Sequence, residues 1–362
     1  MRYLDEFRQK ELAQGLIRKI AEISTKDVSI MEICGTHTHA ISRFGIRQAL
    51  PANIRLISGP GCPVCVTSAS DINRIIDFAR VTPGVIIATF GDMMKVPGSK
   101  TSLQQERANG SNIRVVYSAL GSLDIARQNP DKEVVMYAVG FETTAPTVAA
   151  TIIAAKKEGL KNFSVLSLHK LTPPAMRALL VAGELDIDGF LCPGHVTAII
   201  GARAYGFISS EFNAPCVVAG FEPLDALHGI YMLIRQFEEG RNEIEIQYER
   251  VVRWEGNTKA QEVIAEVFVP ADALWRGIGN IPGSGLAIND SYSGFDAQKR
   301  FSISPGIDEE PKGCACGSVL KGLIRPEGCP LFAKVCTPEF PVGPCMVSSE
   351  GTCAAFYKYR AV

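Results

Sequence analysis

The sequence predicts an α/β protein with two Rossmann-like three-layer lobes and a small cysteine-rich module near its C-terminal end. Three observations lead to this prediction. The chain has 362 residues, more than one small core requires. Short apolar runs alternate with helical patterns over most of its length. Six of the eleven cysteines crowd into its last fifty residues. We therefore expect lobes over residues 1–138 and 139–300, with segments that can cross between them, and a module over residues 301–362.

The first predicted element is an amphipathic helix over residues 3–23, where apolar side chains recur at helical spacing. Apolar runs then predict eight strands, at residues 29–34, 54–58, 85–90, 113–117, 133–139, 162–167, 189–192 and 214–219. Helical patterns lie between them, at residues 70–80, 121–128, 145–158, 174–182 and 223–240. Strands that alternate with helices form βαβ units and parallel sheets. Eight strands exceed the needs of one small doubly wound sheet, which favours two lobes.

The character of the chain changes in its last third. Residues 242–252 show some alternation of polar and apolar side chains, and residues 260–267 resemble another helix. After residue 278 Gly, Pro and Ser become frequent and the periodicity fades. We expect residues 301–362 to be ordered by bound metal rather than by an apolar core.

Composition excludes two classes of function. The 37 basic and 38 acidic residues leave a formal net charge of −1, whereas a dedicated nucleic-acid binder usually has a basic excess. The longest apolar runs are far too short to span a bilayer. The N-terminal residues are charged and lack the apolar core of a signal peptide. We therefore expect a cytoplasmic protein that binds neither nucleic acid nor membrane.

The cysteines of the last segment favour an iron–sulfur cluster. In a reducing compartment, cysteines more often bind metal or perform redox chemistry than form structural disulfides. The six cysteines are Cys314, Cys316, Cys329, Cys336, Cys345 and Cys353. One cubane or one zinc ion needs only four of them, so the simplest division is four ligands and one dithiol pair. Zinc is the alternative, although the segment lacks the two C-x-x-C knuckles usual in zinc ribbons.

A second group of cysteines follows the first two predicted strands. Cys62-Pro63-Val64-Cys65 lies at a predicted helix N-terminus, where unpaired amides and the helix dipole stabilise a thiolate. The proline stiffens the turn, so that both sulfurs can meet in a redox-active disulfide. The alternative is half of a zinc site, with Cys34 and His37 as the other two ligands.

Further candidate site residues also follow strands, where parallel sheets keep their ligand sites. Cys34 precedes His37 and His39, and its soft thiolate suits a soft or low-spin metal; the alternative is an inert buried cysteine. His195 follows Pro-Gly and can move a proton, unless it is a core histidine. Glu142 follows Gly-Phe, where it can hold a histidine tautomer or cap the next helix.

These motifs together resemble the HypD family of hydrogenase maturation proteins. The resemblance rests on Cys-Gly-Thr-His-Thr-His, Gly-Pro-Gly-Cys-Pro-Val-Cys, Gly-Phe-Glu-Thr-Thr, Pro-Gly-His-Val and the cysteine-rich tail, which occur in the family's order over essentially the whole chain. It implies a role in building the Fe(CN)2CO unit of [NiFe]-hydrogenases. The implied partners are the small chaperone HypC and the cyanide-transferring protein HypE, which acts with HypF.

The resemblance also implies roles for individual residues. Cys34 would bind the iron that carries cyanide and CO, with a cysteine of the chaperone as co-ligand. Cys62 and Cys65 would be the redox-active pair facing it. A [4Fe-4S] cluster would be held by four cysteines, Cys314, Cys329, Cys336 and Cys353. Cys316 and Cys345 would form a relay disulfide, an arrangement similar to that of ferredoxin–thioredoxin reductase.

Two other classes of function compete with assembly of a metal centre. An iron–sulfur-dependent thiol-disulfide oxidoreductase would use the cluster and the Cys62–Cys65 pair but would leave Cys34 and the histidines without a role. A structural zinc protein would only recruit partners, and its metal would come without sulfide.

Overall fold

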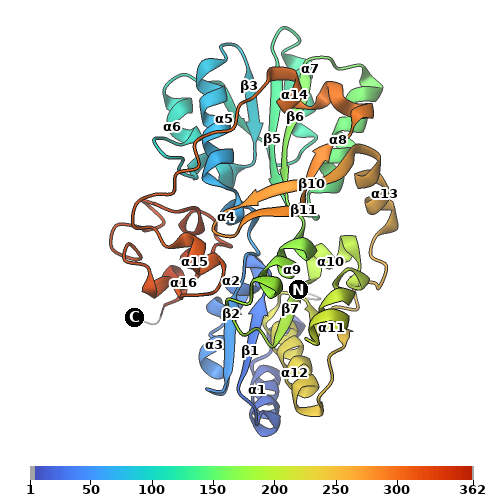
Figure 1. Ribbon diagram of the computed structural model, residues 1–362, viewed down its shortest axis with the longest axis vertical. Coiled ribbons are helices and arrows are strands. Elements are labelled where there is room, and N and C mark those ends of the chain that lie inside the picture. The colour runs from blue at the N-terminus through green and yellow to red at the C-terminus, as the bar shows by residue number, and fades with distance from the viewer. Residues whose placement is uncertain (1–4, 361–362) are drawn as a thin grey trace.

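The computed structural model describes residues 5–360 and has two α/β lobes, each with a parallel sheet (Figure 1). The predicted α/β class is therefore confirmed. The first expected helix is interrupted, with a short 3-10 turn at Asp5–Phe7 followed by α1 at Lys10–Ile23. Residues 3 and 4 of that prediction lie outside the described part. Within residues 5–360, no helix is both long and apolar enough to cross a bilayer.

One lobe, the β1 lobe, is built on five parallel strands in the order β2-β1-β7-β8-β9. Their bounds are Ile54–Ser58, Val28–Glu32, Gly189–Pro193, Cys216–Ala219 and Ile244–Ile246. One face packs on α1, α2 (Gly35–Arg43), α3 (Ile46–Ala49) and α12 (Pro223–Glu239). The other face packs on α9 (Thr172–Ala182), η3 (Ala202–Tyr205) and α11 (Gly206–Phe212), with α10 (Gly194–Ile200) at its edge. Alternate side chains of β2, β1, β7 and β8 enter these two cores, as expected for a sheet covered on both faces, whereas β9 contributes only to the second.

The other lobe, the β5 lobe, has four parallel strands in the order β4-β3-β5-β6. Their bounds are Ile113–Val115, Ile86–Thr89, Val134–Gly140 and Phe163–His169. On one face, Ile75 of α5 (Ala69–Val81) and Leu103 of α6 (Leu103–Ala108) join the core. On the other face, the core includes Leu123 of α7 (Gly121–Gln128) and Ile152 of α8 (Ala145–Glu158). Both lobes therefore have three layers.

The division of the chain between the sheets differs from the expected cut at residue 138. That position falls inside β5, and the β1 lobe takes strands from both ends of the sequence, residues 28–58 and 189–246. The chain enters the β5 lobe after β2 and returns through α9, which packs on the β1 lobe although it directly follows β6. Strand pairing decides this arrangement, because β1 hydrogen-bonds to both β2 and β7.

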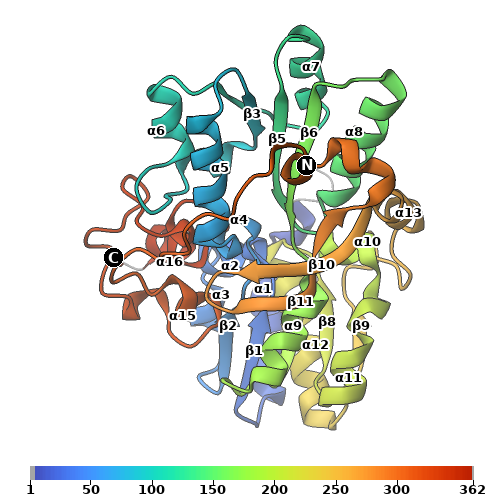
Figure 2. The same ribbon diagram turned by 45° about the horizontal axis from the view of Figure 1, so that its top comes forward.

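An antiparallel hairpin lies between the two lobes, formed by β10 (Phe268–Trp275) and β11 (Gly279–Ile288) (Figures 1 and 2). It follows α13 (Thr258–Val267), which packs on α8. Isolated bridges join Trp275 to Thr67 and Gly285 to Lys170. The hairpin thereby holds the segment after α4 (Pro63–Val66) against the end of β6.

The remaining chain crosses the β5 lobe through η4 (Asp290–Phe295) and α14 (Ala297–Phe301) and ends in the cysteine module, residues 311–360. The module contains α15 (Cys316–Leu320), two 3-10 turns, η5 (Pro326–Gly328) and η6 (Pro344–Met346), and α16 (Thr352–Tyr359). It lies beside the junction of the lobes (Figure 1). Helix α16 packs on α2, and η6 packs on α4, so the module touches both cysteine-bearing segments of the N-terminal region.

Candidate redox and metal-binding site

Cys34 and Cys62 are brought together by two neighbouring strands. Because β1 and β2 are parallel and in register, with Glu32 opposite Ser58, the loops at their carboxyl ends lie side by side. The Gly35 amide donates a hydrogen bond of 2.9 Å to the carbonyl of Gly61. A Cβ on Gly61 would lie 2.3 Å from the amide nitrogen of Cys34, so only glycine permits this approach. Local backbone packing therefore fixes the loop of Cys62 against Cys34.

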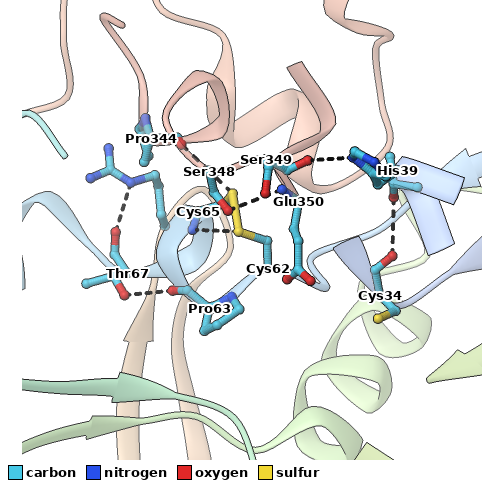
Figure 3. Close-up of a disulfide and its surroundings, with 12 residues drawn as sticks. Cys34, His39, Cys62, Pro63, Cys65, Thr67, Pro344, Ser348, Ser349 and Glu350 are labelled. Carbon is cyan, nitrogen blue, oxygen red and sulfur yellow. Dashed lines mark hydrogen bonds between the residues drawn. A yellow bond between two sulfur atoms is a disulfide. The ribbon is translucent and has the colours of Figure 1, made fainter. Parts of the chain in front are cut away.

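Cys62 and Cys65 form a disulfide in the structure (Figure 3). Cys62 is the N-cap of α4, with Pro63 as the first helical residue, and its sulfur accepts a hydrogen bond of 3.3 Å from the Cys65 amide. Both cysteines are buried, at 4% and 0% exposure. The sulfur of Cys65 lies 4.0 Å from the carbonyl oxygen of Pro344 in the cysteine module. The predicted turn geometry is present, and the pair faces the module.

Glu350 is a member of this site that the sequence analysis missed. Its carboxylate accepts a hydrogen bond of 2.6 Å from the Thr36 hydroxyl, and Figure 3 shows its side chain between Cys62 and Cys34. A Cβ on Gly35 would lie 2.4 Å from its carbonyl oxygen, so the 350 loop sits directly on the start of α2. Burial, and secondly the charge of Glu350, raise the pKa of the Cys34 thiol to about 11. Cys34 is therefore protonated near neutral pH.

His37 points away from the thiols, into the end of β8. It is fully buried, and its Nε2 lies 2.9 Å from the carbonyl oxygen of Gly220. Its Nδ1 is buried and has no hydrogen-bond partner among residues 5–360. Burial lowers its pKa to about 4, so the ring is neutral. His39 instead contacts the module, with Nδ1 at 3.1 Å from the Ser349 carbonyl oxygen and Nε2 at 3.2 Å from the Tyr359 hydroxyl.

His195 and His37 both pack against the ring of Phe221. Their ring centroids are 4.1 Å and 4.7 Å from the phenyl centroid. His195 is exposed and lines a cavity of about 590 Å³ with Phe221, Tyr248 and Arg250. Partial burial lowers the pKa of His195, and the charge of Glu350 opposes that shift. Of these two histidines, only His195 can exchange a proton with solvent or a ligand.

Glu142 acts as a cap in the structure. One carboxylate oxygen accepts a hydrogen bond of 2.7 Å from the Thr172 amide, and the other accepts one of 3.0 Å from the Thr172 hydroxyl. Burial raises the pKa of Glu142 to about 7. Of the two roles weighed for this residue, the hydrogen bonds support capping. The helix is α9, however, which lies across the lobe junction, rather than α8, which follows Glu142 in the chain.

The proposed zinc site of Cys34, His37, Cys62 and Cys65 does not form. Two of these residues are joined in the disulfide, and His37 directs Nε2 to a backbone carbonyl. Across residues 5–360, no three or more His, Cys, Asp or Glu side chains converge as the ligands of one ion would. The disulfide is the bond that the redox interpretation of Cys62 and Cys65 requires.

The six module cysteines form one group of soft donors. Hydrogen bonds from the thiols of Cys314 and Cys345 lower the pKa of Cys316 well below its usual value. Cys345 also contacts Cys353. Burial, together with the charges of Cys353 and Cys316, raises the pKa of Cys336. A Cβ on Gly343 would lie 2.8 Å from the sulfur of Cys314, so backbone closely surrounds the thiols.

This donor set fits a cubane cluster in its chemistry. A cubane takes one thiolate on each of four irons, so its ligands need not converge on a single point, and only sulfur donors are gathered here. The contacts among Cys314, Cys316, Cys345 and Cys353 do not themselves separate cluster ligands from a relay pair.

Comparison with known proteins agrees with these features. The family model "HypD: Hydrogenase formation hypA family" matches residues 11–360. Hydrogenase maturation factor HypD2 of Bradyrhizobium diazoefficiens is 48% identical, over 99% of this chain and 97% of the relative. HypD of Azotobacter vinelandii is 46% identical, with 99% and 97% coverage. HypD of Escherichia coli is 45% identical, with 99% and 98% coverage. Given this similarity over nearly its whole length, the chain belongs to the HypD family of hydrogenase maturation factors.

Proposed function

We propose that this protein is a scaffold and redox factor for assembly of the Fe(CN)2CO unit of [NiFe]-hydrogenases. The observation that carries the proposal is the placement of a single free thiol, Cys34, beside the Cys62–Cys65 disulfide, with Glu350 of the cysteine module between them. Three separate segments of the chain supply one thiol, one disulfide and one carboxylate to one place. The relatives are named hydrogenase maturation factors, which supports assembly of a hydrogenase as the process that this site serves.

Cys34 is the proposed anchor of the iron, which is the cargo of the reaction. Cyanide and CO favour low-spin iron(II), and a soft thiolate complements that metal. Because burial and Glu350 keep the thiol protonated, iron binding must displace its proton. Glu350 is hydrogen-bonded to Thr36, two residues from Cys34, and is placed to accept that proton. A cysteine of the small chaperone HypC would complete the thiolate ligands.

The Cys62–Cys65 pair stores two electrons next to the anchor. The pair faces the cysteine module at Pro344, the residue before Cys345. In the module, Cys314, Cys329, Cys336 and Cys353 would hold a [4Fe-4S] cluster, which supplies single electrons when bound. Cys316 and Cys345, which lie in contact, would form the relay pair between cluster and Cys62–Cys65. Cyanide would arrive from HypE, which acts with HypF.

A complementation assay tests the proposal. In a host that lacks its own HypD-family protein, the wild-type chain restores hydrogenase activity, and Cys34→Ala, Cys62→Ala and Cys65→Ala fail. Cys192→Ala is the matched control, because Cys192 is a fully buried cysteine in the core of the β1 lobe. Full activity with Cys34→Ala would contradict the proposed anchor.

The competing function, a thiol-disulfide oxidoreductase, is favoured by one observation, the formed disulfide next to a cysteine-rich module. It predicts that Cys34→Ala keeps activity while Cys62→Ala loses it. Metal analysis distinguishes both functions from a zinc protein, since a cubane brings four sulfides with its iron and zinc brings none.

A further inference from the structure

Arg276 occupies a position that neither the sequence motifs nor the proposed function explains. It follows β10 in the hairpin between the lobes and is 2% exposed. Its amide donates a hydrogen bond of 2.9 Å to the Val66 carbonyl, and its Nε donates one of 2.9 Å to the Thr67 carbonyl. Val66 and Thr67 are the two residues directly after Cys65. Arg276 therefore holds the chain at the C-terminal end of the disulfide turn.

The same guanidinium also reaches the cysteine module. Its Nη1 pairs with Glu310, at the entrance to the module, and its charge acts on Cys316. The next residue, Gly277, packs backbone to backbone on Gly317, where an added Cβ would lie 2.3 Å from the Gly317 Cα. Arg276 is thus the meeting point of the disulfide segment, the hairpin and the module.

One nitrogen of the Arg276 guanidinium makes none of these contacts. Nη2 is buried and has no hydrogen-bond partner within the described residues. A buried N–H group without a partner costs free energy, and a buried cation costs more. Glu310 offsets this only partly, because its side chain is 45% exposed and its charge is screened by water. The buried guanidinium therefore keeps one N–H group, at Nη2, available to negative charge formed nearby.

We propose that Arg276 is a positioning residue that sets the reduction potential of the Cys62–Cys65 pair and couples it to the cysteine module. The inference rests on the proposed redox role of that pair. Reduction by a dithiol breaks the Cys62–Cys65 bond, forms a disulfide in the reductant and transfers two electrons and two protons. When one of the new thiols loses its proton, the thiolate is stabilised by the cation held next to Val66 and Thr67. The charge of Arg276 therefore favours the reduced pair.

The test is the redox equilibrium of Cys62–Cys65 in the full-length protein under anaerobic conditions. The protein is equilibrated with graded dithiothreitol and glutathione buffers, its thiols are alkylated, and the peptide with both cysteines is quantified by mass spectrometry. Arg276→Gln is expected to shift the equilibrium constant about tenfold toward the disulfide, which lowers the potential by about 30 mV. Arg276→Lys keeps the charge and should shift it less than about threefold.

Two further variants separate charge from structure. Glu310→Gln removes the counter-charge and should shift the equilibrium in the opposite direction, toward the dithiol, whereas simple loosening of the segment would not reverse the sign. Arg300→Gln is the matched control, because Arg300 pairs with Glu133 in the β5 lobe and should leave the equilibrium unchanged.

The outcomes are distinguishable from failure of the proposed function. If the wild-type pair cannot be reduced in any of these buffers, both the redox role of the pair and the inference are wrong. If the wild-type pair titrates and Arg276→Gln matches it within twofold, the inference alone is overturned. Should Arg276→Gln not fold, a shift of Glu310→Gln toward the dithiol supports the inference, and no shift or a shift toward the disulfide overturns it.

Discussion

Replacing Gly61 by alanine tests whether backbone contact fixes the Cys62 loop against Cys34. The new Cβ would lie 2.3 Å from the amide nitrogen and 2.4 Å from the Cα of Cys34, and 2.6 Å from the carbonyl carbon of Ile33. All three atoms belong to the backbone at the end of β1, so no side chain can rotate away. The two loops must separate by about 1 Å to regain ordinary van der Waals contact.

The expected cost follows from two contributions. Overpacking of this kind costs about 1–3 kcal/mol. The Gly35–Gly61 hydrogen bond, now 2.9 Å, would stretch beyond its useful range and lose about 1 kcal/mol. We therefore expect Gly61→Ala to lower the free energy of unfolding by about 2–4 kcal/mol.

Urea denaturation measures this difference, with Gly206→Ala as the matched control. Gly206 begins α11 with φ −50°, and no atom lies within 4 Å of its added Cβ. Gly206→Ala should therefore be neutral or stabilising by up to about 1 kcal/mol. If Gly61→Ala and Gly206→Ala unfold at the same urea concentration, the contact does not constrain the loop and the reasoning is refuted.

Three other predictions follow from the site. The rate of Cys34 alkylation in iron-free protein, followed by mass spectrometry as a function of pH, should have its midpoint near pH 11. Glu350→Gln should move this midpoint to lower pH, because it removes the negative charge that disfavours the thiolate. An unmoved midpoint would contradict the role of Glu350. Glu142→Gln should retain hydrogenase maturation. Glu142→Ala leaves the Thr172 amide of α9 unpaired and should lower the free energy of unfolding by about 1–3 kcal/mol. Loss of maturation in a stable Glu142→Gln protein would instead indicate a chemical role. Removal of metal by a chelator should increase hydrogen exchange within residues 311–360 and leave the strands of both lobes protected, because each lobe has an apolar core of its own. Uniform loss of protection would show that metal orders the whole chain.

The sequence predicted most of the strands because they are apolar runs with buried side chains, such as residues 134–139 of the predicted run 133–139, which lie in β5. Periodicity could not predict which sheet a strand joins. β7 pairs with β1 although the whole β5 lobe lies between them in sequence. The hairpin of β10 and β11 was not predicted either, since its second strand contains Gly and Pro. The hairpin is held by cross-strand pairing and by bridges from β10 to Thr67 and from β11 to Lys170.

The candidate site was predictable where residue type and local turn geometry determine the chemistry. Cys62 and Cys65 lie on one turn, so their spacing already indicated the disulfide. Glu350 could not be found this way, because its contact with Thr36 spans 314 positions and a lone glutamate between cysteines carries no signal. The orientation of His37 depends likewise on Gly220 and Phe221, which reach it only through the packing of β8 and α2.

The central claim is that Cys34 binds the iron cargo, and infrared spectroscopy tests it most directly. The protein is produced anaerobically together with the proposed partner, a small HypC chaperone, and the region of metal-bound cyanide and CO stretches is recorded. We predict cyanide and CO bands for the wild type and for Cys192→Ala, and none for Cys34→Ala with the cysteine module still loaded with iron and sulfide. Unchanged bands in Cys34→Ala would contradict the claim.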